Sequence, residues 1–200
     1  MPALFFIVWD EWFTQIGVWG FNPRYLTGIY VLSLPIEEIL FFICIPYACV
    51  FTYEAMNYLI TWRMSSKQQN LITDVLAGIL FFLGVVFFNQ WYTSITFILT
   101  SIFLNLHRWV WKTNYLGKFY VAFLFILIPF FIVNGILTGT GIEDQVVWYN
   151  NLENLGIRMG TIPVEDTFYG MLLILMNASL FEYLQKKKGL GTPPSKLVNR

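Results

Sequence analysis

The sequence is poor in charged residues. Charged side chains make up 12% of the 200 positions, the formal net charge is zero, and hydrophobic residues account for 57%. So few charges cannot coat a soluble globule of this size, and the composition instead predicts an integral membrane protein. The lack of a positive excess also argues against nucleic acid as a partner.

Histidine, cysteine and glycine motifs are equally sparse. The single histidine, His107, stands alone, and the two cysteines, Cys44 and Cys49, lie five residues apart, where they point to different faces of a helix. We therefore expect neither a zinc site nor a disulfide. The sequence 139–141, Gly-Thr-Gly, lacks the third glycine of a dinucleotide fingerprint. No lysine lies in the middle of an apolar segment to carry retinal, and no aspartate-rich diphosphate motif occurs. These absences predict chemistry without a metal or other cofactor.

Long apolar segments are abundant. Crossing a bilayer takes about 20 mostly apolar residues, and five segments meet this length: Pro35 to Trp62, Ile72 to Phe88, Thr93 to Trp111, Leu116 to Thr138 and Pro163 to Tyr183. The N-terminal stretch to Phe13 is too short and resembles the second half of the fourth segment. We predict an all-α bundle of about five full transmembrane helices preceded by a truncated one.

The basic residues indicate an orientation. Counting crossings puts most of them on one face: Arg63, Lys67, Arg108, Lys112, Lys118, Lys186, Lys187, Lys188, Lys196 and Arg200. Only Arg24 and Arg158 fall on the other face. Cytoplasmic loops carry an excess of Lys and Arg, so we expect a cytoplasmic C-terminal tail.

The chain contains an internal duplication. A shift of 128 positions superposes Pro-Ile-Glu-Glu at 35–38 on Pro-Val-Glu-Asp at 163–166. The same shift also aligns Phe21 and Asn22 with Tyr149 and Asn150, Gly28 and Ile29 with Gly156 and Ile157, Phe41 with Tyr169, and Glu54 with Glu182. An even number of crossings separates the copies, which predicts a parallel duplication. We divide the chain into a first repeat (1–62), a connecting helix (63–92), a second repeat (93–185) and a basic tail (186–200).

Each motif places two carboxylates in the first turn of a helix. Proline suits that turn, and its free N–H groups favour the ionised form, whereas apolar surroundings and a like-charged neighbour favour the neutral one. A pair divided into acid and base is a plausible outcome. We expect Glu37 and Glu165 to be the principal acid–base residues, with Glu38 and Asp166 modulating the charge. An ordinary acidic helix cap is the structural alternative for a single motif, and the duplication weighs against it.

Other residues of the repeats have less specific roles. A spacing of nineteen residues from the proline puts Glu54 and Glu182 about 28 Å further along their helices, where we expect a structural or interfacial role. The candidates for lining a substrate cavity are Phe41, Phe42, Phe168, Tyr169, Asn22 and Asn150.

Four stretches resemble a known family. They are 10–14 (DEWFT), 18–25 (VWGFNPRY), 34–42 (LPIEEILFF) and 160–170 (GTIPVEDTFYG). These stretches resemble the polytopic lycopene cyclases of bacteria and archaea, in the form of that family in which two domains are fused in tandem. The resemblance implies a β-cyclase of carotenoid biosynthesis, an isomerase without redox change that acts on lycopene or a related apolar carotenoid in the cell membrane. It also implies essential carboxylates at Glu37, Glu38, Glu165 and Asp166. Fused members of the family usually begin with a further helix and a complete second one, and this sequence begins later.

Two other functions stay open from the residues alone. Carboxylates at a repeat interface also suit a small proton- or cation-coupled transporter. A related carotenoid-modifying enzyme, such as a hydratase that quenches the cation with water, would need the same acid. Association with a second copy of the chain is equally open.

Overall fold

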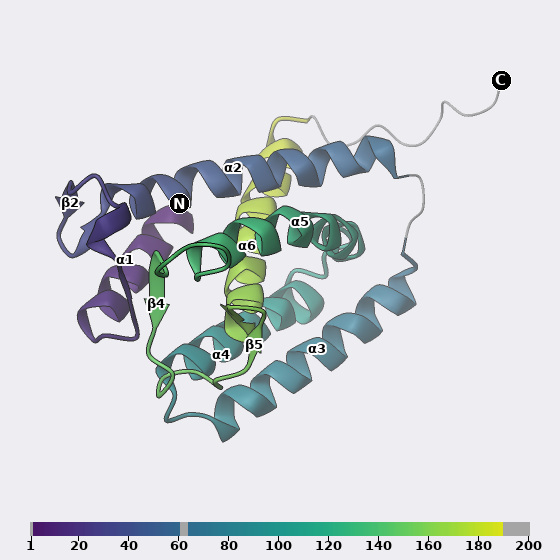
Figure 1. The fold of residues 1–200 in the computed structure, drawn as a ribbon. Coiled ribbons are helices and arrows are strands. Elements are labelled where there is room, and N and C mark those ends of the chain that lie inside the picture. The colour runs from purple at the N-terminus through teal and green to yellow at the C-terminus, as the bar shows by residue number, and fades with distance from the viewer. Residues whose placement is uncertain (1, 61–63, 190–200) are drawn as a thin grey trace.

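The computed structural model describes residues 2–60 and 64–189, which form six α-helices and six short strands (Figure 1). The helices are α1 (Pro2–Gln15), α2 (Ile36–Leu59), α3 (Ser66–Val86), α4 (Trp91–Asn105), α5 (Leu116–Leu137) and α6 (Val164–Lys187). Four of them, α2, α3, α5 and α6, are long and apolar enough to cross a membrane. The predicted all-α membrane fold is confirmed. The predicted span end Trp62 and the cations Arg63, Lys196 and Arg200 lie outside the described residues.

The helix α3 begins six residues earlier than the apolar segment predicts. Its first turns are polar, so hydropathy alone leaves them out. Ser65 caps this end: its side chain accepts a hydrogen bond from the Gln68 backbone N–H, and the Gln68 side chain accepts one from the Ser65 N–H. This reciprocal capping box stabilises a helix start regardless of hydropathy.

The predicted span from Thr93 to Trp111 is built from two kinds of helix. The α-helix α4 ends at Asn105 and continues as a π-helix, η2 (Leu106–Val110). The wider turn brings His107 into the interior, where Ser179 lies 3.0 Å from its Nε2 and Thr113 lies 3.1 Å from its Nδ1. The lone histidine therefore joins α4 to α6 by hydrogen bonds.

Short strands link the two repeats, a feature that the apolar pattern does not predict. The strand β1 (Trp19–Phe21) pairs antiparallel with β4 (Val147–Tyr149), and the shift of 128 residues relates these same two strands. Hydrogen bonds are exchanged symmetrically at its ends, from Asn22 N–H to the Val146 carbonyl and from Asn150 N–H to the Val18 carbonyl, both at 2.8 Å. Such a reciprocal contact is what a two-fold relation between the repeats produces.

Each repeat also folds a small hairpin just before its carboxylate motif. In the first repeat β2 (Tyr30–Val31) pairs with β3 (Leu34–Pro35), and in the second β5 (Arg158–Met159) pairs with β6 (Ile162–Pro163). The first turn holds Leu32 at φ 57°, the second holds Gly160 at φ 66°. Glycine adopts this left-handed conformation freely, whereas leucine is strained there.

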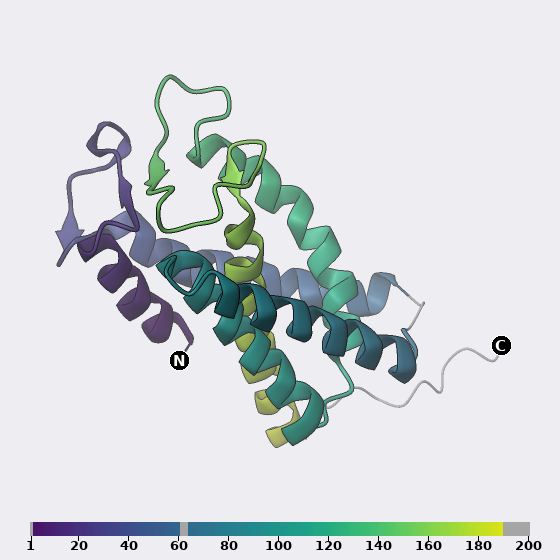
Figure 2. The same cartoon turned by 90° about the horizontal axis from the view of Figure 1, so that it is seen from below.

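The strands and the motif-bearing helix starts gather at one end of the molecule. Figure 2 shows all three two-stranded sheets there, with the C-terminal ends of α2, α4 and α6 at the opposite end. Both α2 and α6 thus begin at the same level, as a parallel duplication requires. A single 3-10 turn, η1 (Pro23–Tyr25), follows β1 in the same region.

Candidate functional site

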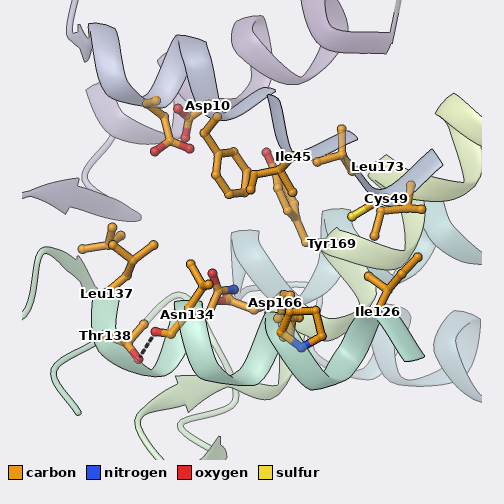
Figure 3. Close-up of a pocket in the computed structure, with 18 of the residues that line it drawn as sticks. Asp10, Ile45, Cys49, Ile126, Asn134, Leu137, Thr138, Asp166, Tyr169 and Leu173 are labelled. Atoms are coloured by element: carbon orange, nitrogen blue, oxygen red, sulfur yellow. Dashed lines mark hydrogen bonds between the residues drawn. The ribbon is translucent and has the colours of Figure 1, made fainter. Parts of the chain in front are cut away.

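A mainly apolar cavity of about 230 Å³ lies between α2, α5 and α6, beneath the β1–β4 pair. Figure 3 shows Asp10 on one side of it, and on the other Asn134 and Leu137 of α5 with Thr138, the residue that follows this helix; Leu173 of α6 lies near Ile45 and Cys49. Most of the remaining lining is aliphatic or aromatic. A cavity of this kind suits an apolar guest held close to a few polar groups.

Both repeats contribute equivalent residues to this one cavity. Six pairs related by the shift of 128 line it: Asp10 with Thr138, Trp19 with Val147, Phe21 with Tyr149, Glu38 with Asp166, Phe41 with Tyr169 and Ile45 with Leu173. The pairing of β1 with β4 at its roof explains this arrangement. The cavity therefore lies close to the pseudo-two-fold axis and is shared by the repeats.

Three carboxyl groups face the cavity, those of Asp10, Glu38 and Asp166. Asp10 is 2% exposed; its Oδ1 accepts a hydrogen bond of 2.6 Å from the Trp19 indole N–H, and its Oδ2 is buried without a partner. Glu38 interacts electrostatically with both aspartates. Within residues 2–60 and 64–189, no Lys or Arg forms a salt bridge with any of the three. This group of acids is thus not neutralised by a cation in contact with it.

The equivalent carboxyls Glu38 and Asp166 differ in their hydrogen bonds. Asp166 accepts from two phenols, Tyr92 at 2.5 Å and Tyr149 at 2.8 Å. Burial, and then the charge of Asp166, raises the pKa of Tyr149 well above its usual range, so this phenol stays protonated and remains a donor. In the described part of the chain, no hydrogen bond to the Glu38 carboxyl was found. Two donors favour the ionised form of Asp166, and the absence of donors in apolar surroundings favours neutral Glu38.

The first carboxylate of each motif caps a loop. Glu37 Oε1 accepts a hydrogen bond of 2.8 Å from Thr27 N–H, and Glu165 Oε1 accepts one of 2.8 Å from Leu155 N–H, the equivalent position of the second repeat. Glu165 is fully buried and also accepts from Thr93 at 2.6 Å. Neither glutamate lines the cavity. The four predicted carboxylates are thus divided into an inner pair and an outer pair.

Two of the six predicted substrate-binding residues line the cavity, Phe41 and Tyr169. Phe42 packs in an aromatic cluster against Phe6, and Phe168 packs against Phe97 of α4 at 5.2 Å between ring centroids. These two rings lie elsewhere because successive helical residues point about 100° apart.

Asn22 and Asn150 do not line the cavity either. The Asn22 side chain accepts from Arg24 N–H and the Asn150 side chain accepts from Leu152 N–H, both at 3.1 Å. Side-chain caps of this kind turn the chain after β1 and β4. The repeated asparagines thus shape the roof of the cavity.

The sequence analysis did not single out Asp10, Tyr92 or Tyr149. Tyr92 lies outside the repeat pattern, and Asp10 aligns with Thr138, so the duplication gives no signal for either. Tyr149 aligns with Phe21, which lacks the hydroxyl group. A buried aspartate in a short apolar helix is itself an available signal, because charges at bilayer depth are expensive.

A second carboxyl cluster lies toward the other end of α2 and α6. Lys118 Nζ donates to Glu54 Oε2 at 2.9 Å and to Glu182 Oε1 at 3.3 Å. Tyr53 also donates to Glu182, and its ring lies beneath the Lys118 ammonium. Lys118 therefore bridges the equivalent glutamates of both repeats, an arrangement consistent with the structural role expected for them.

The described residues were compared with the side-chain groups that bind metal ions. Among the described residues, no group of three or more His, Cys, Asp and Glu side chains has a geometry that would hold a metal ion.

The comparisons with known proteins agree with the motifs. The chain matches the family model described as lycopene cyclase over residues 1–56 and 89–184. The interval between the two matched parts contains α3, the helix that connects the repeats. Searches of curated proteins and of solved structures each gave no match. Because the family model covers most of the sequence, including both carboxylate motifs, the chain belongs to the lycopene cyclase family.

Proposed function

We propose that the protein closes the ends of lycopene into β-ionone rings by acid–base catalysis in the shared cavity. The observation that carries this proposal is the unequal environment of the equivalent carboxyls Glu38 and Asp166. One has no hydrogen-bond donor and the other has two. An acid and a base facing one apolar cavity are the two groups that a proton-neutral isomerisation needs.

Glu38 is the acid. Its proton adds to the terminal double bond of lycopene, leaving a tertiary cation. The next double bond attacks this cation, which closes a six-membered ring and moves the positive charge onto a ring carbon. Glu38 suits this step because a carboxyl in apolar surroundings, without a hydrogen-bond donor to its oxygens, is still protonated when the substrate binds.

Asp166 is the base. It removes a proton from the ring carbon next to the cation, and the electron pair of that bond becomes the ring double bond. Before this transfer its negative charge, held by Tyr92 and Tyr149, stabilises the positive charge of the ring. The aromatic faces of Phe41 and Trp19, which also line the cavity, add cation–π attraction.

Asp10 returns the proton. After one cycle Glu38 is ionised and Asp166 is protonated, so the starting state requires transfer between them. Asp10 faces the same cavity and has an unpartnered oxygen, Oδ2. It interacts electrostatically with Glu38 and thus offers a further carboxyl that can accept a proton and pass it to Glu38. The overall reaction adds one proton to the substrate and removes one, with no redox change.

The outer glutamates support the site without taking part in proton transfer. Glu37 and Glu165 hold the loops that precede α2 and α6, and so fix where the next residue of each motif points. Our proposal therefore exchanges the roles expected within each pair. The Lys- and Arg-rich end of the molecule, with the tail, is the cytoplasmic one in this proposal.

Amide substitutions of the four carboxylates test the assignment. In lycopene-accumulating cells, Glu38→Gln and Asp166→Asn should each reduce ring formation by about 10²- to 10⁴-fold, the usual contribution of a general acid or base. Glu37→Gln and Glu165→Gln keep a carbonyl oxygen that can accept the loop N–H, so they should retain most activity. Pigments are separated by chromatography, and protein amount is measured by immunoblot.

Four results would contradict the proposal. Cells with the wild-type chain that form no cyclised carotenoid would refute the function itself. Full ring formation by Glu38→Gln would refute the choice of acid. Loss of activity confined to the Glu37 and Glu165 variants would return the acid–base roles to these two residues. A hydroxylated product would identify the chain as a hydratase.

A further inference from the structure

The cavity lies on a pseudo-two-fold axis, yet it extends to one side only. Toward α5 it is bounded by Asn134, Leu137 and Gly170. The equivalent residues of the first repeat are Phe6, Trp9 and Phe42, and these do not line the cavity.

The aromatic residues of the first repeat occupy the matching volume. Phe6 stacks with Phe42 at 6.1 Å between ring centroids, and it meets the edge of Tyr169 at 5.2 Å. Trp9 lies 5.0 Å from the same Tyr169 ring. Phe6 is fully buried, Phe42 is 2% exposed and Trp9 is 5% exposed. Closely packed aromatic rings of this kind leave no room for a substrate.

On the α5 side of the cavity, the small residue Gly170 leaves space for a substrate. Gly170 and Phe130 both line the cavity, and a Cβ atom built on Gly170 would already meet the Phe130 ring at 3.4 Å, so a large side chain at position 170 would take up space in the cavity. The ring of Phe41, equivalent to Tyr169, faces this free volume and is not covered by an aromatic stack like that around Tyr169.

On this side three residues that line the cavity are exposed. Ala48 of α2 and Pro129 and Val133 of α5 line the cavity and are themselves exposed on the outside of the bundle, within helices that are long enough to span the membrane. An apolar chain can therefore lie across this rim, with its end group inside and the remainder in lipid.

From these observations we infer that the protein has a single end-group site, located on the α5 side, and that Gly170 sets its size. This inference rests on the proposed cyclisation. Glu38 from one repeat and Asp166 from the other then act on the same ring. The two ends of a carotenoid must enter the same site in turn, with release or reversal of the molecule between the two ring closures.

The test replaces Gly170 with the residue of the other repeat. Gly170→Phe should fill the site and lower formation of both the first and the second ring by at least about tenfold, the effect typical of blocking a fitted apolar pocket. Asn134→Phe places on α5 the residue that the first repeat has at the equivalent position, Phe6, and should block the same site. The matched control is Gly78→Phe on α3, where nothing lies within 4 Å of an added Cβ. The amount of monodisperse protein in detergent identifies folded variants.

The products separate this inference from the proposed function. If the wild type cyclises lycopene and a folded Gly170→Phe or Asn134→Phe variant leaves it acyclic, the single site is supported. If such a folded variant accumulates a monocyclic carotenoid or retains full activity, a second site exists and the inference is wrong. Should Gly170→Phe fail to fold, Asn134→Phe alone decides. A wild type without cyclised product would refute the proposed function instead.

Discussion

The molecule brings equivalent carboxyl groups of its two repeats together at two levels. Near the starts of α2 and α6, Glu38 and Asp166 meet with Asp10 around a cavity and without a bound cation. Toward the far ends of the same helices, Glu54 and Glu182 meet around Lys118. Duplication alone thus explains the proximity in both clusters.

The difference between the clusters lies in what surrounds the acids. In the second cluster one lysine contacts two partly buried carboxylates, one from α2 and one from α6, and so holds these helices together. In the first cluster no Lys or Arg of residues 2–60 and 64–189 forms a salt bridge with the acids, which favours the neutral form of a carboxyl there. We therefore propose that a cation in contact with the acids, rather than the carboxyl pair itself, distinguishes the structural cluster from the one to which we assign catalysis.

The largest effect is expected from removing the cation. Lys118→Met should destabilise the protein by about 3 kcal/mol, roughly 1.5 kcal/mol for each of two lost hydrogen bonds between partly buried charges, because Glu54 and Glu182 lose their only shared ionic partner among the described residues. Thermal unfolding in detergent measures this change. The combined variant Lys118→Met, Glu54→Gln, Glu182→Gln should recover most of the loss. An unchanged unfolding temperature for Lys118→Met would mean that the second cluster does not clamp the helices.

Removing one acid from the cavity should affect turnover rather than folding. Asp10→Asn keeps an oxygen that can accept the Trp19 N–H but cannot return a proton, so steady-state turnover should fall by about a hundredfold. The ring formed in a single turnover should remain, since Glu38 begins that cycle protonated. Rapid-quench measurements in proteoliposomes distinguish the two phases. Glu11→Gln, next in the chain and outside the cavity, is the control; a loss of the first turnover in Asp10→Asn would contradict the relay role.

The phenols of the cavity should matter for catalysis. Tyr149→Phe removes one of the two donors to Asp166, so the rate should fall by about tenfold, as for the loss of one hydrogen bond to a charged group. The remaining donor, Tyr92, limits the loss. The initial rate is measured against protein that is matched for unfolding temperature. A rate equal to that of the wild type would show that the base does not depend on this donor.

The matching phenol of the other cluster should give the smallest effect, and a different one. Tyr53→Phe removes the donor to Glu182 and should lower the free energy of unfolding by about 1–2 kcal/mol. The rate per folded molecule should stay the same, because Tyr53 lies outside the cavity. Comparing Tyr53→Phe with Tyr149→Phe therefore asks whether the two clusters are functionally distinct. A slower rate in the Tyr53 variant would link them.

Much of the fold was predictable because bilayer thickness and hydropathy constrain helix length directly. The segment from Leu116 to Thr138 agrees with α5 to within one residue. The start of α3 was wrong by six residues, since its capping box is polar and carries no hydropathy signal. The β1–β4 pair was not predicted either, because three residues in each strand are too few for a periodic pattern.

The candidate site was predictable only to the level of the motif. The repeat identifies Glu37, Glu38, Glu165 and Asp166, yet it does not say which member of each pair points inward. That choice depends on the loops before the two hairpins, where the backbone N–H groups of Thr27 and Leu155 donate hydrogen bonds to the first glutamate of each motif. Asp10 and Gly170 are invisible to the repeat, because each is a position at which the two copies differ.

The exposed rim formed by Ala48, Pro129 and Val133 has a kinetic consequence. An enzyme that draws its substrate sideways from the bilayer responds to the mole fraction of substrate among the lipids, not to its amount per volume of water. At fixed amounts of protein and carotenoid, adding empty lipid to the same vesicles should slow the reaction by surface dilution. The reaction rate should therefore also depend on the lipid composition of the membrane, because acyl chains pack beside α2 and α5 at this rim.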